Sequence, residues 1–382
     1  MIPRTLFSEE HAMYRAMVRR FVDAEVVPHH AAWEKARCVP RAFWQKAGAA
    51  GLLCPSAPEA YGGPGGDFLF NVIVGEEFMR VGATGPGFAL HNDIAFPYLD
   101  HHGTEAQKQR FVPKMVSGDV ITALAMSEPD AGSDLQGVRT TAVKAGDGYV
   151  INGSKTFITN GQLCDLVIVV AKTDPSAKAH GISLFLVEAD RPGFVRGRNL
   201  DKIGMKAQDT SELFFEDLHV PADALLGHEN AGFMYLMTEL AQERLSVASL
   251  AVAGAEAALD WTLTYTKERA AFGRPIAKFQ NTRFKLAEMA AEIAVGRVFV
   301  DRCLELHLQG KLDVPTAAKA KLWATEMQFR VLDECVQLFG GYGYMNEYPI
   351  ARAWADARVQ RIYAGTSEIM KELIARSLIA HT

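Results

Sequence analysis

Residues 166–187 read LVIVVAKTDPSAKAHGISLFLV, and this stretch decides the fold class of the chain. Two short apolar runs, 166–170 and 182–187, flank a polar segment that contains a proline, which is the pattern of buried strands joined by a loop. Similar short runs stand at 120–126, 149–153 and 212–215. Because no helical patterns of about 10–15 residues alternate with these runs, an antiparallel barrel or sandwich is favoured over a doubly wound sheet.

Helical patterns lie on both sides of this β region. Ser8, ahead of Glu9 and Glu10, predicts the start of a first helix, since a serine caps and acidic side chains stabilise a helix N-terminus. Towards the other end, three long stretches contain few helix breakers: 231–267, 279–309 and 315–339. The sequence therefore predicts an α+β chain with an N-terminal α-helical domain, a middle antiparallel β-barrel or sandwich domain and a C-terminal helical bundle. The expected boundaries are 1–120, 121–230 and 231–382.

The composition excludes several classes of function. Of the 382 residues, 49% are hydrophobic and 22% are charged, as in ordinary globular proteins. The formal net charge of −5, without a basic stretch, gives no reason to expect nucleic-acid binding. No apolar run is long enough to predict a membrane span. The absence of an N-terminal leader pattern favours the bacterial cytoplasm over the mitochondrial matrix.

The cysteines and histidines suggest neither a disulfide framework nor a metal site. The five cysteines are odd in number and form no CxxC pair, so we expect reduced thiols. The histidine pairs 29–30 and 101–102 are adjacent residues, which do not face one another on a helix. We therefore predict no metal.

Two segments of the β region could bind a ligand. Residues 124–134, LAMSEPDAGSD, lead from a strand into a loop whose hydroxyls and backbone N–H groups could cradle a phosphate or hydrogen-bond the edge of a ring. A simple capped turn is the alternative, and local chemistry favours it. Residues 155–161, KTFITNG, place an aromatic ring and a hydroxyl two positions apart, on one side of a strand. An ordinary strand ending in an Asn-Gly turn is the alternative, and local chemistry favours it here too.

Two further segments lie in the helical C-terminal part. Residues 269–275, RAAFGRP, end a long helix, and their Arg and Phe could hold a pyrophosphate and an adenine. The alternative is an arginine that interacts with the helix C-terminus. Residues 337–344, QLFGGYGY, follow a helix rather than a strand, so they fail the context test of a Rossmann dinucleotide loop.

Together, the order and spacing of these segments resemble those of the FAD-dependent acyl-CoA dehydrogenases. Residues 126–134 are similar to the first signature of that family, and residues 337–343 with Arg352 and Asp356 are similar to the second. The resemblance covers essentially the whole chain, and the long-chain and isovaleryl-type branch is the most similar.

The resemblance implies a set of FAD contacts. Met126 and Ser127 would bind the edge of the isoalloxazine, Phe157 would stack near it and Thr159 would lie close to N5. The remaining implied contacts are Ser133, Arg269, Phe272, Gln280, Gln337, Gly340, Gly341, Thr366 and Glu368. Arg269, Phe272 and Gln280 would reach the FAD of a neighbouring subunit, which implies a homo-oligomer, expected to be a tetramer.

The resemblance also singles out the catalytic base. Most of the family carries Glu immediately before the Gly-Thr of residues 365–366, but this chain has Ala364, which cannot accept a proton. The long-chain and isovaleryl-type branch carries the base on a helix, just before an arginine, where this chain has Glu243 and Arg244. Glu243 is therefore the implied base, and a solvated helix face is the alternative. The implied contacts with the substrate are Ser133, Arg244 and the backbone of Ala364.

The implied reaction converts a fatty acyl-CoA, long-chain or branched, to the trans-2-enoyl-CoA and passes the electrons to an electron-transfer flavoprotein. Two alternatives remain: a catalytically silent acyl-CoA-binding or assembly protein, which Ala364 suggests, and a flavin oxidase of the same fold. Small residues after Glu243 could leave room for the acyl chain or allow close helix packing. They are Ser246, Ala248, Ser249, Ala251, Ala253 and Gly254.

Overall fold

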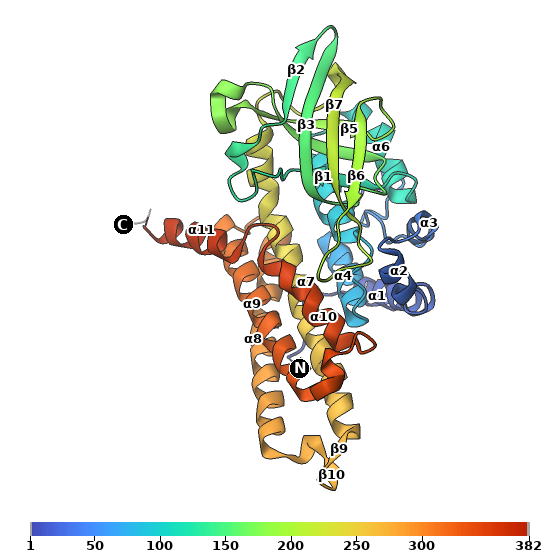
Figure 1. The fold of residues 1–382 in the computed structure, drawn as a ribbon, viewed down its shortest axis with the longest axis vertical. Coiled ribbons are helices and arrows are strands. Elements are labelled where there is room, and N and C mark those ends of the chain that lie inside the picture. Colours follow the sequence, from blue (N-terminus) through green and yellow to red (C-terminus); the bar gives the residue numbers. More distant parts are fainter. Residues whose placement is uncertain (1, 380–382) are drawn as a thin grey trace.

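The computed structural model describes residues 2–379, in which helices flank a β region on both sides along the chain (Figure 1). The Ser8 side chain accepts a hydrogen bond from the backbone N–H of His11, and the His11 ring bonds back to Ser8, so the predicted cap of the first helix is confirmed. The helices of the N-terminal part are α1 (Glu9–Phe21), α2 (His30–Ala36), α3 (Arg41–Ala49), α4 (Phe68–Arg80), α5 (Phe96–His102) and α6 (Glu105–Ser117).

A π-helical turn, Leu90–Ala95, leads directly into α5. Such turns insert an extra residue into a helix and occur often at functional sites. This turn lies against α7 and places polar side chains next to the cavity described below.

The β region forms one mixed sheet. Its strands follow the order β6-β7-β3-β2-β4-β5-β8, and β1 pairs with β4. Most neighbours are antiparallel, as expected, but β4 pairs in parallel with both β1 and β2. The strands are β1 (Thr122–Ala125), β2 (Thr141–Ala145), β3 (Gly148–Thr159), β4 (Leu166–Lys172), β5 (Ile182–Glu188), β6 (Phe194–Asn199), β7 (Thr210–Pro221) and β8 (Leu225–Leu226).

The C-terminal part is the predicted helical bundle. Figure 1 shows α7 running from beside the β region to a small hairpin at the opposite tip of the molecule. The helices are α7 (Gly232–Glu268), α8 (Gln280–Leu308), α9 (Val314–Phe339), α10 (Pro349–Ala357) and α11 (Ser367–Ile379). The hairpin consists of β9 (Ala270–Ala271) and β10 (Arg274–Pro275), which separate α7 from α8.

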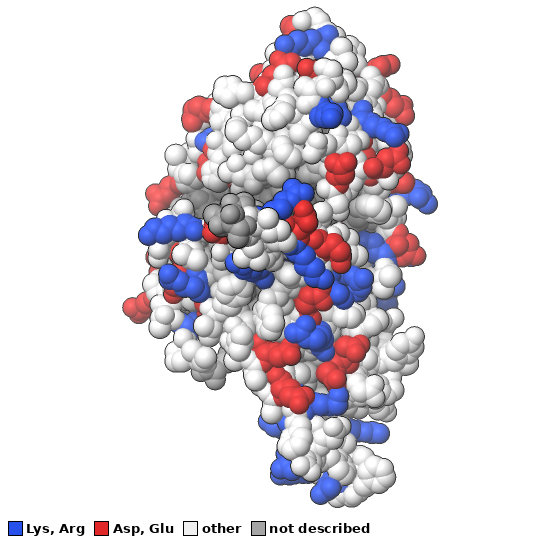
Figure 2. All heavy atoms as spheres, turned by 90° about the vertical axis from the view of Figure 1, so that its left-hand side faces the viewer, with Lys and Arg blue, Asp and Glu red and all other residues white. Residues whose placement is uncertain are grey.

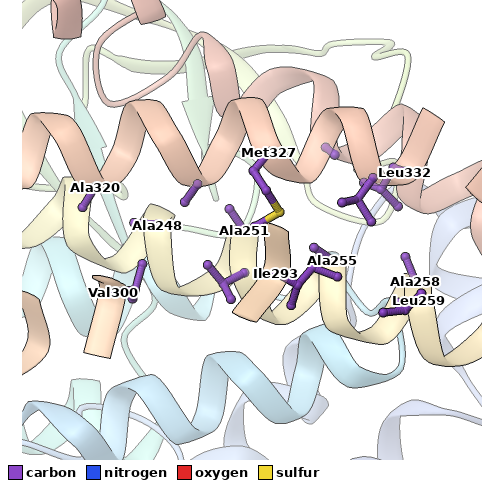
Figure 3. Close-up of a cluster of buried hydrophobic side chains, with 14 of the residues drawn as sticks. Ala248, Ala251, Ala255, Ala258, Leu259, Ile293, Val300, Ala320, Met327 and Leu332 are labelled. Atoms are coloured by element: carbon purple, nitrogen blue, oxygen red, sulfur yellow. The ribbon is translucent and has the colours of Figure 1, made fainter. Parts of the chain in front are cut away.

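The small residues of α7 lie on two different sides of the helix. Ala248 and Ala251 belong to a buried cluster in which α7 packs against α8 and α9 (Figure 3). Short side chains allow such helices to approach closely, so these two alanines are packing residues. Ser246 and Gly254 instead line a cavity on another side of the helix.

No helix within residues 2–379 combines the length and the apolar character needed to cross a bilayer. All five cysteines are free thiols, which agrees with the expectation from the sequence.

Candidate functional site

A cavity of about 250 Å³ lies where the β region meets α4, α7 and α10. Glu243 of α7, Thr159 at the end of β3 and Ala364 before α11 all line it. The structure therefore brings together three predicted residues that stand far apart in the sequence. Arg244, adjacent to Glu243, is not among the lining residues: it is buried, and its Nε has no hydrogen-bond partner within residues 2–379.

Glu243 is a buried carboxyl group and not part of a solvated helix face. Only 4% of its surface is exposed. Tyr98 of α5 donates a hydrogen bond to Glu243 Oε1 at 3.1 Å. Burial raises the pKa of Glu243 to about 7, although the Tyr98 hydrogen bond and the charge of Arg244 oppose this effect. A carboxyl group with this pKa can accept a proton near neutral pH and release it again.

The backbone at Ala364 is held in a special conformation at the cavity wall. Ala364 has a left-handed φ of 52°, and Gly365 follows with a φ of 93°. The buried Lys321 of α9 donates a hydrogen bond to the Gly365 carbonyl oxygen at 2.6 Å, which holds this turn in place. Non-glycine residues adopt such a φ rarely, and they do so mainly where the surrounding structure imposes it.

The segments predicted to bind a flavin ring lie side by side. Lys155 Nζ donates to the Met126 carbonyl at 3.1 Å, and the Thr156 N–H donates to the Ser127 carbonyl at 3.0 Å. The pairing of β3 with β7 is irregular between Lys155 and Ile158, as in a β-bulge, so the simple alternation of sides does not hold there. Phe157, inside the irregular stretch, has a left-handed φ of 60° and is 70% exposed. Thr159 instead lines the cavity.

A second, more open hollow of about 570 Å³ lies where α7 and α9 end. Arg269 and three other predicted FAD contacts line it: Gln337, Gly340 and Gly341. The Arg269 guanidinium lies 5.6 Å from the centre of the Tyr342 ring. Side chains added at Gly340 or Gly341 would meet no atom within 4 Å, so the backbone faces open space there.

The remaining predicted contacts lie on the surface, except that Thr366 is half-buried. Phe272, at the turn of the hairpin, is 95% exposed, and Gln280 is exposed at the start of α8. Figure 2 shows basic side chains gathered at this lower tip of the molecule, a charge that suits a phosphate-bearing ligand. Thr366 caps the start of α11 by accepting from the Ile369 N–H at 3.2 Å, and Glu368 is exposed beside it. Ser133 is exposed in its loop.

Two sets of predicted residues therefore lie apart, one around the cavity and one around the second hollow. Both hollows are lined by residues of α7: Glu243 lines the cavity, and Tyr265 lines the second hollow. At a rise of 1.5 Å per residue, about 33 Å of helix separates them. The cavity and the second hollow thus lie beside well-separated stretches of one helix.

Sequence reasoning missed Tyr98, whose hydroxyl contacts the predicted base, Glu243. Tyr98 and Glu243 are 145 residues apart, and nothing in the local sequence around Tyr98 indicates the contact. It also missed Asn71 and Asp93, which line the same cavity. Within residues 2–379, no cluster of His, Cys, Asp or Glu side chains could hold a metal ion.

Comparison with known proteins identifies the family. The models of the acyl-CoA dehydrogenase N-terminal, middle and C-terminal domains match residues 8–119, 123–218 and 230–379. The chain belongs to the acyl-CoA dehydrogenase family. It is therefore an oxidoreductase of a family that uses FAD, and the expected order of helical, β and helical parts is confirmed.

Individual acyl-CoA dehydrogenases are similar over nearly the whole chain. The long-chain specific mitochondrial enzyme of Mus musculus is 55% identical over 379 residues, which is 99% of this chain and 88% of the relative. The crystal structure of an acyl-CoA dehydrogenase from Geobacillus kaustophilus is 53% identical, with a TM-score of 0.97 over 98% of this chain and 100% of that one. A glutaryl-CoA dehydrogenase from Mycobacterium smegmatis in complex with FADH2 is 29% identical, with a TM-score of 0.90 over 98% and 95% of the two chains.

The residues present fit a flavin cofactor. The backbone of Met126 and Ser127 is hydrogen-bonded to Lys155 and Thr156, which directly precede the exposed ring of Phe157, and this suits a flat ring with a polar edge. The second hollow combines the Arg269 cation with open glycine backbone, which suits an adenosine phosphate.

Proposed function

We propose that this protein dehydrogenates a fatty acyl-CoA thioester to the trans-2-enoyl-CoA, with Glu243 as the catalytic base. The observation that carries the proposal is the position of Glu243. It is buried, its pKa is about 7, and it lines the same cavity as Thr159 and the backbone of Ala364.

The chemistry requires a base in such a position. The thioester carbonyl makes the α proton removable when a hydrogen bond stabilises the charge that develops on its oxygen. We assign that hydrogen bond to the Ala364 N–H, which remains available although the side chain has no carboxylate. Because Tyr98 donates to Glu243 Oε1, we assign the α proton to Oε2. Bound FAD supplies the acceptor for the β hydride, so one proton and one hydride leave as the double bond forms.

The length of the cavity supports a long acyl chain. Its lining on α7 extends from Glu243 through Leu250 and Gly254 to Trp261. These residues span about 27 Å of helix. The wall is largely apolar, as an alkyl chain requires. We therefore propose long-chain substrates, straight or branched.

We further propose that the active form is a homo-oligomer, expected to be a tetramer. The separation of the two groups of predicted FAD contacts along α7 supports this proposal, because the residues of the second hollow can then bind a neighbouring subunit's FAD. An electron-transfer flavoprotein is the proposed acceptor of the electrons.

An anaerobic absorbance titration of the purified protein with straight and branched acyl-CoAs of increasing length tests the proposal. We expect bleaching of the flavin band, most readily with long chains. A yellow protein that no acyl-CoA bleaches would contradict dehydrogenation and favour a silent acyl-CoA-binding protein. Rapid reoxidation of the bleached protein by air, faster than by an electron-transfer flavoprotein, would indicate an oxidase instead.

A further inference from the structure

A cluster of polar side chains lines the acyl cavity one helical turn beyond Glu243. Its members are Asn71 of α4, Asp93 of the π-helical turn and Ser246 of α7. Ser246 follows Glu243 by three residues, so the two share one side of the helix and lie about 4.5 Å apart along its axis. An acyl chain that extends from Glu243 towards Trp261 passes this cluster a few carbons beyond the reacting bond.

The cluster is organised around the carboxylate of Asp93. Asn71 Nδ2 donates a hydrogen bond to Asp93 Oδ1 at 2.9 Å, and Ser246 Oγ donates to Asp93 Oδ2. Gln242 binds the Asp93 backbone carbonyl at 2.7 Å, which holds the π-helical turn against α7. Asn71, Asp93 and Ser246 are all buried.

One atom of the cluster lacks a partner. Asn71 Oδ1 is buried and accepts no hydrogen bond from any residue of the described part of the chain. A second amide oxygen further along the same cavity, Gln328 Oε1 opposite Gly254, is in the same situation. Leaving a buried acceptor unpaired costs about 1–3 kcal/mol, and an alkyl chain has no donor with which to satisfy it.

The free positions of the cluster are acceptors, so they fit a ligand that donates. The donors of the cluster are already used: Asn71 Nδ2 donates to Asp93 and to the Asn92 carbonyl oxygen at 3.4 Å, and the Ser246 hydroxyl donates to Asp93. Burial raises the pKa of Asp93 to about 6, against the effect of those two hydrogen bonds, so the carboxylate still predominates at neutral pH. A hydroxyl group on the acyl chain could donate to Asn71 Oδ1 or to Asp93.

We propose that the cavity accepts acyl-CoA thioesters whose chain carries a hydroxyl group a few carbons beyond the reacting bond, and that Asn71 and Asp93 accept this hydroxyl's hydrogen bond while Ser246 holds the Asp93 carboxylate in place. The inference rests on the dehydrogenase function proposed above and specifies its substrate class. The alternative is that ordered water binds the cluster and an unsubstituted chain is the preferred substrate. The experiment below distinguishes the two.

The decisive experiment uses the wild-type holoenzyme. Hexadecanoyl-CoA is compared with a series of hydroxyhexadecanoyl-CoAs that carry the hydroxyl on successive mid-chain carbons, by anaerobic flavin bleaching and by kcat/KM. We expect one position to exceed its neighbours by about ten-fold or more in kcat/KM, because a hydrogen bond to a charged group replaces an unpaired acceptor.

The outcomes separate the two proposals. If hexadecanoyl-CoA bleaches the flavin and every hydroxylated chain is a poorer substrate without a preferred position, the hydroxyl subsite is wrong and dehydrogenation stands. If no thioester of either kind bleaches the flavin, the dehydrogenase proposal itself fails.

Matched variants locate the subsite. Ser246→Ala removes a hydroxyl that faces the cavity, whereas Ser249→Ala removes one on the same helix that donates to the Leu245 carbonyl and does not line the cavity. We expect the preference for the best hydroxylated chain over hexadecanoyl-CoA to fall by about five-fold or more in Ser246→Ala and in Asn71→Leu. It should persist in Ser249→Ala. An unchanged preference in both cavity variants would show that other residues bind the hydroxyl.

Discussion

Two regions along α7 differ in how far their predicted functional residues are buried. Near its start, Glu243 is enclosed by elements of the same chain, and the burial that raises its pKa needs no second subunit. At its other end, Arg269 and Phe272 lie at an exposed hairpin, and Phe272 is almost fully exposed to solvent. One chain is therefore sufficient to bury the proposed base and raise its pKa, whereas the proposed use of the hairpin needs a ligand held by a neighbouring subunit.

The sharpest test of the first end is Glu243→Gln, which keeps the shape of the side chain but removes the base. We expect turnover with hexadecanoyl-CoA to fall by about 10²–10⁴-fold, while the FAD content per chain, measured by absorbance, stays that of the wild type. Glu239→Gln is the control: Glu239 lies one turn earlier on α7 and binds His101 and His102 at 3.0 and 2.9 Å. Equal losses in the two variants would remove Glu243 as the base.

Variants at the hairpin end of α7 should lose FAD affinity and keep turnover, the opposite of Glu243→Gln. We expect Arg269→Ala and Phe272→Ala to weaken FAD binding by about ten-fold or more, since each removes a charge-assisted or stacking contact, with turnover per bound FAD retained. Fluorescence titration of the apoprotein measures the affinity. Arg274→Ala is the matched control on the same hairpin, because that guanidinium lies 4.3 Å from the centre of the Phe279 ring. Wild-type affinity in both tip variants would contradict the shared site.

Between the two ends, Gly254 tests whether the acyl chain runs along α7. A Cβ there would lie 2.5 Å from Gln328 Nε2 and 2.8 Å from Met79 Cε, both of which are ends of flexible side chains. We expect Gly254→Leu to lower kcat/KM for hexadecanoyl-CoA about ten-fold more than for butanoyl-CoA, because only the long chain reaches this point. Gly254→Ala should have a much smaller effect. A uniform loss for all chain lengths would indicate general disruption instead.

The smallest expected effect concerns the pH dependence. Because the base must be deprotonated, we expect kcat to rise as the pH increases through about 7 and then to level off. The Tyr98 hydrogen bond lowers the pKa of Glu243, so Tyr98→Phe should move this midpoint to higher pH, by about half to one unit. Tyr235→Phe, which alters a tyrosine of α7 that accepts from the His228 N–H, should leave it in place. A midpoint that falls in Tyr98→Phe would contradict the assignment.

Local sequence patterns predicted most of the elements correctly. The long C-terminal helices were expected at 231–267, 279–309 and 315–339 and lie at Gly232–Glu268, Gln280–Leu308 and Val314–Phe339. They were predictable because helix breakers and caps act within a few residues of each other. The parallel pairing of β4 with β1 and β2 was not, since strand order depends on contacts between distant segments.

The sequence by itself determined the family, and it pointed to Glu243 through the combination of Ala364 with Glu243 and Arg244. Only the tertiary structure decided that Glu243 is buried, that Tyr98 contacts it, and that Asn71 and Asp93 stand beside it. The physical reason is that burial and pKa depend on what packs around a side chain. For Glu243, the hydrogen-bonding neighbour Tyr98 comes from a helix 145 residues away along the chain.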